Sequence, residues 1–312
     1  MPKKRKSSRS RSTSWLAPVA LVLAAAAVAA YLFAPRPHGH ERPAAVARAT
    51  AAAEPSPTPE ETATAAPSPS SEPTAAPTPT PAATIAPAAA VATGPKLALI
   101  VDDCGQWVDI ERGFIALPIP LTLSVLPHVH AGTEISQEAA AAGKGVMLHL
   151  PMETLSGMYP GPGEIKTSMS DQEVAEQVAD DLAQVPLAKG VNNHEGSKAS
   201  ADPRVMRDVM KALSKHGDLF FIDSRTNAAS VGAQEASSAG IPTASRDVFL
   251  DNKEDVAYSE AQLREAAELA KRNGSAIAIG HPRATTLEAV RNLIPELQAQ
   301  GIHFVLVESL TR

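Results

Sequence analysis

Residues 97–105 read LALIVDDCG, in which five apolar residues are followed at once by two adjacent carboxylates, Asp102 and Asp103. An apolar run of this length is typical of a strand that is buried on both faces of a sheet. The two neighbouring negative charges repel each other. A cation between them would remove this repulsion, because one carboxylate could bind it while the other acts as a base.

Short apolar runs of the same kind recur along the chain and alternate with amphipathic stretches. We expect strands over 97–101, 121–126, 145–150, 189–193, 218–223, 247–250, 275–280 and 303–308. We expect helices over 132–142, 171–184, 203–215, 258–272 and 286–299. Two helix starts have clear signals, a capping box of Ser170 with Glu173 and the pair Asp202-Pro203.

Near-continuous apolar strands that alternate with helices indicate parallel pairing with both faces of the sheet covered. The sequence therefore predicts an α/β fold, a distorted (β/α) barrel of seven or eight mostly parallel strands. A doubly wound open sheet is the alternative.

The chain before this region divides into three parts. Residues 1–14 carry six Lys or Arg and no acid, 15–33 carry no charge, and 34–94 are rich in Pro, Ala and Thr. A helix over 15–33 would measure roughly 28 Å, close to the thickness of the bilayer's hydrocarbon core. The basic flank predicts that the N-terminus is cytoplasmic.

We therefore expect a basic cytoplasmic segment (1–14), a transmembrane anchor (15–33), a disordered tether (34–94) and a folded domain (95–312). This organisation predicts a single-pass protein of the inner membrane with its domain in the periplasm or outside the cell. A cleaved signal peptide ending near AVAA (27–30) is the alternative.

The composition of 95–312 excludes two classes of site. This region holds 19 Lys and Arg against 29 Asp and Glu, which argues against a nucleic-acid partner because such a partner needs a basic face. The single cysteine, Cys104, excludes an intramolecular disulfide and any multi-cysteine metal site.

Side chains that can bind metal or move protons follow nearly every predicted strand. Because the carboxyl ends of parallel strands gather on one face, we expect these side chains to meet there. They are Asp102, Asp103, His149, His194, Asp223, Asp251 and His281. Oxygen and imidazole donors without sulfur suit zinc or a similar divalent ion that keeps one position open for water.

Several of these side chains also have a purely structural explanation, which the sequence leaves open. His149 in LHLPME (148–153) could be a core histidine, and Glu153 could orient its ring. The cluster GVNNHEGS (190–197) supplies Asn193 and His194, and a simple turn does not explain the histidine.

The later motifs are equally open. Asp223 and Arg225 are either an ion pair or a site where the arginine holds a substrate group. Asp251 has a structural or substrate-contact role, and His281 suits a general acid. His128, which forms an i, i+2 pair with His130, can point to either side, and we assign the pair no role.

The motifs VDDCG, LHLPME, GVNNHEGS, FIDSRT, FLDN and IGHP, in this order, resemble those of the divergent polysaccharide deacetylase family. That family is a branch of the carbohydrate esterases with the NodB-homology fold. The resemblance covers about 96–310 and implies a distorted (β/α) barrel that removes acetyl groups from an N-acetylated sugar with the help of a metal.

The resemblance also implies roles for individual residues. Asp102 matches the catalytic base, Asp103 and His149 match metal ligands, and His281 matches the acid that protonates the leaving amine. Glu153 stands where the broader superfamily has a second histidine, so His194 is the candidate for the missing ligand. Two further positions differ from the branch, which favours Leu and Met where this chain has Cys104 and Glu195.

The expected function is that of a membrane-tethered, metal-dependent hydrolase acting on peptidoglycan or another N-acetylated envelope glycan. The glutamate at position 153 keeps a second hypothesis open, an inactive envelope glycan-binding or scaffolding protein on the same fold. A metallohydrolase for some other ester or amide is a third.

Overall fold

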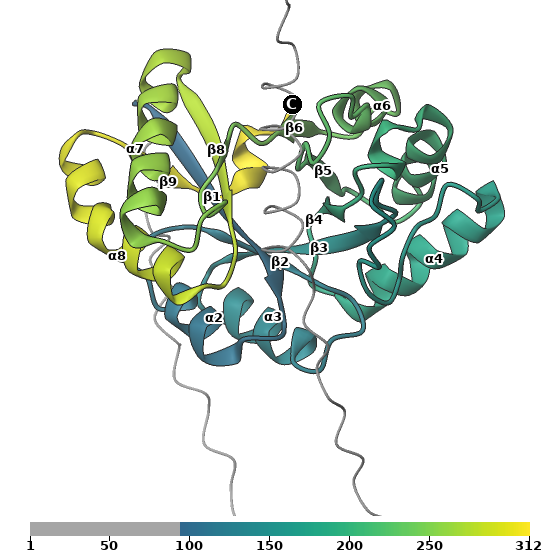
Figure 1. The fold of residues 1–312 in the computed structure, drawn as a ribbon, viewed down its shortest axis with the longest axis horizontal. Coiled ribbons are helices and arrows are strands. Elements are labelled where there is room, and N and C mark those ends of the chain that lie inside the picture. Colours follow the sequence, from purple (N-terminus) through teal and green to yellow (C-terminus); the bar gives the residue numbers. More distant parts are fainter. Residues whose placement is uncertain (1–93) are drawn as a thin grey trace, which may run out of the picture. The chain divides into compact units, whose positions relative to one another are not determined.

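The computed structural model describes residues 94–312, which form a curved sheet with helices on its outer side (Figure 1). The predicted basic segment, membrane anchor and tether lie outside the described residues. Within residues 94–312, none of the helices combines the length and the apolar character needed to span a bilayer.

All strands belong to one parallel sheet with the order β6-β5-β4-β3-β2-β1-β8-β7, and β9 pairs with the start of β1. The strands are β1 (Lys96–Cys104), β2 (Thr122–Val125), β3 (Gly145–Met152), β4 (Gly190–Glu195), β5 (Phe220–Asp223), β6 (Thr243–Ser245), β7 (Val248–Phe249), β8 (Ser275–Gly280) and β9 (His303–Val305). The predicted distorted barrel is confirmed.

Helices connect the strands and cover the outside of the sheet (Figure 1). They are α2 (Val108–Ile115), α3 (Gly132–Ala141), α4 (Asp171–Gln184), α5 (Pro203–Leu213), α6 (Gly232–Ser238), α7 (Val256–Asn273) and α8 (Ala284–Ala299), with two 3₁₀ turns, η1 (Ala199–Ala201) and η2 (Val307–Leu310). Both predicted helix starts are confirmed. The capping box of Ser170 and Glu173 is complete, and the Asp202 side chain accepts hydrogen bonds from the backbone of α5.

The alternation of side chains along each strand determines which residues face the barrel interior at the carboxyl ends of the strands. Successive side chains of a strand face opposite sides, so one set packs under the helices and the other faces the barrel interior. The interior set includes Ala98 and Ile100 of β1 and Ile277 and Ile279 of β8, all buried. The same alternation, continued by two residues at the carboxyl end of each strand, brings Asp102 and His281 above this apolar layer.

The barrel is closed by a chain segment rather than by a regular strand pair. Residues 243–250 cross from β5 to β8, because β6 pairs with β5 and β7 pairs with β8. Between them, Arg246 donates its backbone N–H to Asp223 and Asp247 donates its own to Ile277. This short connection distorts the barrel, and it includes β6, which was not predicted.

Candidate metal centre

Both carboxylates at the end of β1 reach the same site because the strand is irregular there. The register between β1 and β2 shifts between Val101 and Cys104, and Asp103 has a φ of +56°. A regular strand would send Asp102 and Asp103 to opposite faces, but the bulge and the left-handed residue turn both inward. A non-glycine residue in this conformation is uncommon, and such residues cluster at functional sites.

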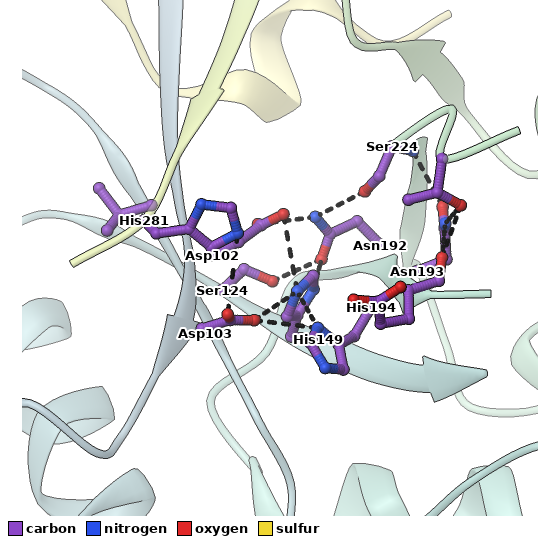
Figure 2. Close-up of polar contacts among 12 residues, drawn as sticks. Asp102, Asp103, Ser124, His149, Asn192, Asn193, His194, Ser224 and His281 are labelled. Carbon is purple, nitrogen blue, oxygen red and sulfur yellow. Dashed lines mark hydrogen bonds and ion pairs between the residues drawn. The ribbon is translucent and has the colours of Figure 1, made fainter. Parts of the chain in front are cut away.

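Asp103, His149 and His194 bring three potential ligand atoms together (Figure 2). Asp103 Oδ1 lies 3.2 Å from His149 Nε2 and 2.9 Å from His194 Nδ1, and the two ring nitrogens are 3.1 Å apart. Tetrahedral ligands at the usual zinc distances are about 3.3–3.4 Å apart. The observed triangle is close to this spacing, so Asp103, His149 and His194 could together hold one divalent ion.

The three atoms fit a divalent cation better than they fit a hydrogen-bond network. Asp103 Oδ1 is buried and accepts no hydrogen bond, although both imidazoles are close to it. A buried carboxylate oxygen without a partner is costly, and an ion at this point would satisfy it together with two nitrogen lone pairs. One carboxylate and two imidazoles form a ligand set suited to zinc.

Asn192 orients His149 for this purpose (Figure 2). His149 Nδ1 lies 2.8 Å from Asn192 Oδ1, to which it donates its proton, so Nε2 keeps a free lone pair that faces Asp103. The Asn192 amide also accepts from Ser124 and donates to Asp102 and Ser224. The side chain is fully buried, and its contacts fix the ligand as an outer-shell partner does in many metal sites.

Sequence reasoning missed Asn192, although a signal for it existed. It lies two residues before His194 on β4 and is paired in register with His149 on β3. The period of two along a strand therefore places Asn192 on the same face as both histidines.

Glu153 does not orient His149, contrary to the expectation. Its carboxylate accepts from the backbone N–H and hydroxyl of Thr167 at 2.7 and 2.6 Å and from Lys198 Nζ at 2.7 Å. Burial would raise the pKa of Glu153, but these partners hold it at about 2. The chain has left β3 at Met152, so the side chain at 153 no longer faces the barrel and instead joins two loops.

Asp102 lies directly behind the three ligand atoms. Its Oδ1 accepts from Asn192 Nδ2 at 2.8 Å, and its Oδ2 lies 3.6 Å from His149 Nε2. Burial raises the pKa of Asp102, although His149 and His281 oppose the shift. A carboxylate with a raised pKa is a better proton acceptor near neutral pH.

His281 and the buried Asp251 form a hydrogen-bonded pair on the other side of Asp103. His281 Nδ1 lies 3.0 Å from Asp251 Oδ1, and the second oxygen of Asp251 accepts from the backbone of His281 and from Thr286. His281 Nε2 faces Asp103 Oδ2 at 3.7 Å. Burial lowers the pKa of His281, but Asp251 and Asp103 outweigh it, so the pKa is raised. Of the two roles expected for Asp251, its contacts are structural ones.

Asp223 and Arg225 are not among the residues that line the pocket over the ligand atoms. Asp223 accepts from the backbone of Arg225 and Ala233 and from the Ser230 hydroxyl, so it organises the loop after β5. Within residues 94–312, the contact between Asp223 and Arg225 is this backbone hydrogen bond of 2.8 Å, and no ion pair links their side chains. Arg225 is exposed, with a φ of +50°.

Asn193 fastens the ends of two neighbouring strands. Its Oδ1 accepts from the backbone of Ser224 at 2.9 Å, and its Nδ2 donates to the carbonyl of Glu195 at 3.1 Å. Asn193 therefore supports the rim of the site and does not contact the ligand atoms.

A pocket of about 360 Å³ opens over these groups, within the size range of small-ligand sites. Its lining consists of Asp102, Asp103, His149, Asn193, His194, Glu195, Ser224, Thr226, Phe249, Asp251, Asn252, His281 and Arg283. A second cavity of about 160 Å³ also contains Asp103 and His194, and several prolines line it.

Comparisons with known proteins agree with this architecture. Residues 99–311 match the family model described as divergent polysaccharide deacetylase. The chain is 35% identical over 212 residues to an uncharacterized protein of Haemophilus influenzae, covering 66% of this chain and 75% of that protein. It is 34% identical over 202 residues to the uncharacterized protein YibQ of Escherichia coli, covering 65% and 63%.

A solved structure is similar over most of the described region. The crystal structure of the uncharacterized protein ATU2773 from Agrobacterium tumefaciens C58 superposes with a TM-score of 0.68 at 25% identity. The superposition covers 71% of this chain and 91% of that one.

Proposed function

Because this chain belongs to the divergent polysaccharide deacetylase family, we propose that it is a metal-dependent hydrolase that removes acetyl groups from an N-acetylated envelope polysaccharide. We further propose that residues 15–33 anchor it in the inner membrane and that the domain acts on the far side, within reach of the tether.

One observation carries the proposal. The three atoms Asp103 Oδ1, His149 Nε2 and His194 Nδ1 converge at 2.9–3.2 Å from one another beneath a pocket. They come from three different strand ends, and Asp103 Oδ1 accepts no hydrogen bond. This arrangement supports a bound divalent ion, for which zinc is the best fit to the donor set.

A bound ion would supply a Lewis acid that polarises the acetamide carbonyl and strengthens water as a nucleophile near neutral pH. Asp102 accepts the proton of the attacking water. Its position 3.6 Å from His149 Nε2 places it beside the ligand atoms, and Asn192 holds its other oxygen. The raised pKa of Asp102 favours this proton transfer.

His281 donates the second proton. Asp251 holds the Nδ1 side of the ring, so Nε2 faces the pocket and can protonate the departing nitrogen. The raised pKa of His281 keeps it protonated to a higher pH than a free histidine. Protonation of the nitrogen releases an amine instead of an unstable amide anion, which is the usual task of a general acid.

The test is acetate release by the purified full-length chain. The protein is freed of metal, reloaded with zinc or another divalent ion, and incubated with N-acetylglucosamine oligomers or peptidoglycan fragments. We expect acetate from the wild type and a loss of at least about 100-fold in His281→Ala, because general acid catalysis contributes at least this much. Glu176→Gln, which changes an exposed acid of α4 outside the pocket, is the control.

The same experiment separates the alternative function. A glycan-binding or scaffolding protein would bind the oligomers and release no acetate with any metal. In the sequence, Glu153 is the residue that favours this alternative, because it stands where a second histidine ligand is expected. In the structure, His194 lies beside His149 and Asp103 and can serve as the third ligand instead.

A further inference from the structure

A second group of metal-binding side chains lies outside the pocket. His128 belongs to the loop after β2, and Asp180 and Asp181 belong to the last turns of α4. His128 Nε2 lies 3.1 Å from Asp180 Oδ2 and 3.2 Å from Asp181 Oδ1. The three atoms lie within 4.8 Å of one another.

One carboxylate oxygen of Asp181 is buried and accepts no hydrogen bond. Its side chain is fully buried, Oδ1 accepts from Gln177 at 3.0 Å, and Oδ2 has no hydrogen-bond partner. Burial raises the pKa of Asp181 to about 8, an effect that Gln177 opposes and Asp180 reinforces. A buried carboxylate that lacks a partner for one oxygen is costly in its charged form, and a positive charge beside it would stabilise that form.

The rest of the structure does not supply this charge through a basic residue. The C-terminal end of a helix carries a partial negative charge, which makes the acidic pair less favourable there. The last turn of α4 contains no basic residue. Within residues 94–312, the ion pairs of Asp180 and Asp181 are made with His128 alone.

We propose that His128, Asp180 and Asp181 bind a second divalent cation of the zinc class, separate from the metal centre of the pocket. One imidazole and two carboxylates are donors that such an ion accepts, and spacings of 3.1 and 3.2 Å are close to those of tetrahedral ligands. The side chains of Asp180 and His128 are 56% and 27% exposed, so an ion enters from solvent and keeps water as its remaining ligand.

The cation would join two loops that form one wall of the smaller cavity. His128 lies between Pro127 and Val129, both of which line that cavity beside Asp103. Asp181 packs against Gly163, where an added Cβ would come within 2.3 Å of Asp181 Oδ1.

Residues 160–162, which precede this glycine directly, line the same cavity. A cation held by the α4 acids and His128 therefore fixes both loops next to the metal centre. This role does not depend on the hydrolase proposed above.

The test is zinc stoichiometry of the full-length chain after removal of metal, measured by equilibrium dialysis and elemental analysis. We expect two zinc ions in the wild type and one in the double variant His149→Ala with His194→Ala. We also expect one in His128→Asn with Asp180→Asn, with affinity at the altered site at least about 100-fold weaker, since a direct ligand is worth more than an outer-shell partner.

These two substitutions should leave the fold intact. Asparagine tolerates the left-handed conformation of His128, whose φ is +57°, and Asp180 is exposed. Glu176→Gln, an exposed acid on the same helix, is the matched control and should keep both ions.

The quadruple variant should bind no zinc, which rules out binding elsewhere on the acidic surface. The proposal is overturned if the double variant His149→Ala with His194→Ala binds no zinc, or if His128→Asn with Asp180→Asn still binds two ions. Absence of acetate release would refute the proposed hydrolase and leave these stoichiometries unchanged, so the two failures are distinguishable.

Discussion

Replacing Asn192 with alanine removes a side chain that uses all of its hydrogen-bonding capacity inside the barrel. The amide accepts from His149 and Ser124 and donates to Asp102 and Ser224. After the change, the two serine hydroxyls can rotate to new partners. The His149 Nδ1–H and Asp102 Oδ1 cannot move in this way, because both side chains are buried.

The loss of stability in Asn192→Ala follows from the two groups left without a hydrogen-bond partner, the His149 Nδ1–H and Asp102 Oδ1. Each buried group left without a partner costs about 1–3 kcal/mol, so the free energy of unfolding should fall by about 2–6 kcal/mol. His149 also loses the contact that fixes its ring. Loss of such an outer-shell partner weakens metal binding by about 10–100-fold, which corresponds to about 1.4–2.7 kcal/mol.

Asn192→Asp separates the two roles of the amide. The new carboxylate still accepts from His149, but it replaces a donor that lies 2.8 Å from Asp102 Oδ1 with a second negative charge. Zinc affinity should therefore fall less than in Asn192→Ala. Acetate release should fall in both variants, and in Asn192→Asp the acidic limb of the pH–rate profile should move to higher pH because a like charge raises the pKa of Asp102.

The assay is competition for zinc between the full-length chain and a chromogenic chelator, together with urea unfolding. Asn193→Ala is the control, since Asn193 is the neighbouring amide and contacts neither His149 nor Asp102. If Asn192→Ala binds zinc as tightly as Asn193→Ala does, then Asn192 does not orient His149 and the reasoning is wrong.

Three further variants test other parts of the domain. Asp251→Asn removes the carboxylate that raises the pKa of His281, so the alkaline limb of the pH–rate profile should move to lower pH; an unmoved limb would show that His281 is not the proton donor. Glu153→Gln should leave zinc affinity unchanged within about threefold, because its partner is Lys198 and not a metal ligand; a larger loss would return Glu153 to the metal centre. The pKa of Glu153 is about 2 and its ordinary value is 4.5, so the stability that the carboxylate supplies is present above pH 4.5 and is lost as the pH falls toward 2. Urea unfolding should therefore show a smaller difference between Glu153→Gln and wild type at pH 2 than at pH 7. Ile279→Ala in the barrel interior should lower the free energy of unfolding by about 2–5 kcal/mol and leave the zinc stoichiometry unchanged. If urea unfolding shows a loss below about 1 kcal/mol, Ile279 is not tightly packed in the barrel interior.

Most of the strands and helices could be predicted because their signals are local. An apolar run such as 97–101 and a capping box such as that of Ser170 and Glu173 depend only on neighbouring residues. The helix α2 was missed because its start has no local cap. Glu111, from within the helix, accepts instead from the backbone N–H groups of Gly105, Gln106 and Trp107, an arrangement that only the folded loop creates.

The candidate site was predictable to the extent that it follows strand ends. Asp103, His149 and His194 each lie at or near the end of a strand that the sequence predicts, and the structure brings their donor atoms together. Asn192 lies in the middle of β4, where an amide resembles any other buried polar residue. Glu153 was misjudged because sequence distance from His149 says nothing about the direction of a side chain after the strand has ended.

The bulge at the end of β1 gives chemically identical neighbours opposite acid–base properties. One left-handed residue leaves the first carboxylate enclosed, where burial makes it easier to protonate, and turns the second toward two imidazoles that keep it ionised against the effect of burial. The two aspartates are therefore not interchangeable, although a comparison of composition would treat them as equivalent. These properties depend on the bulge, so the backbone conformation of this segment matters to its chemistry as much as the identity of its residues.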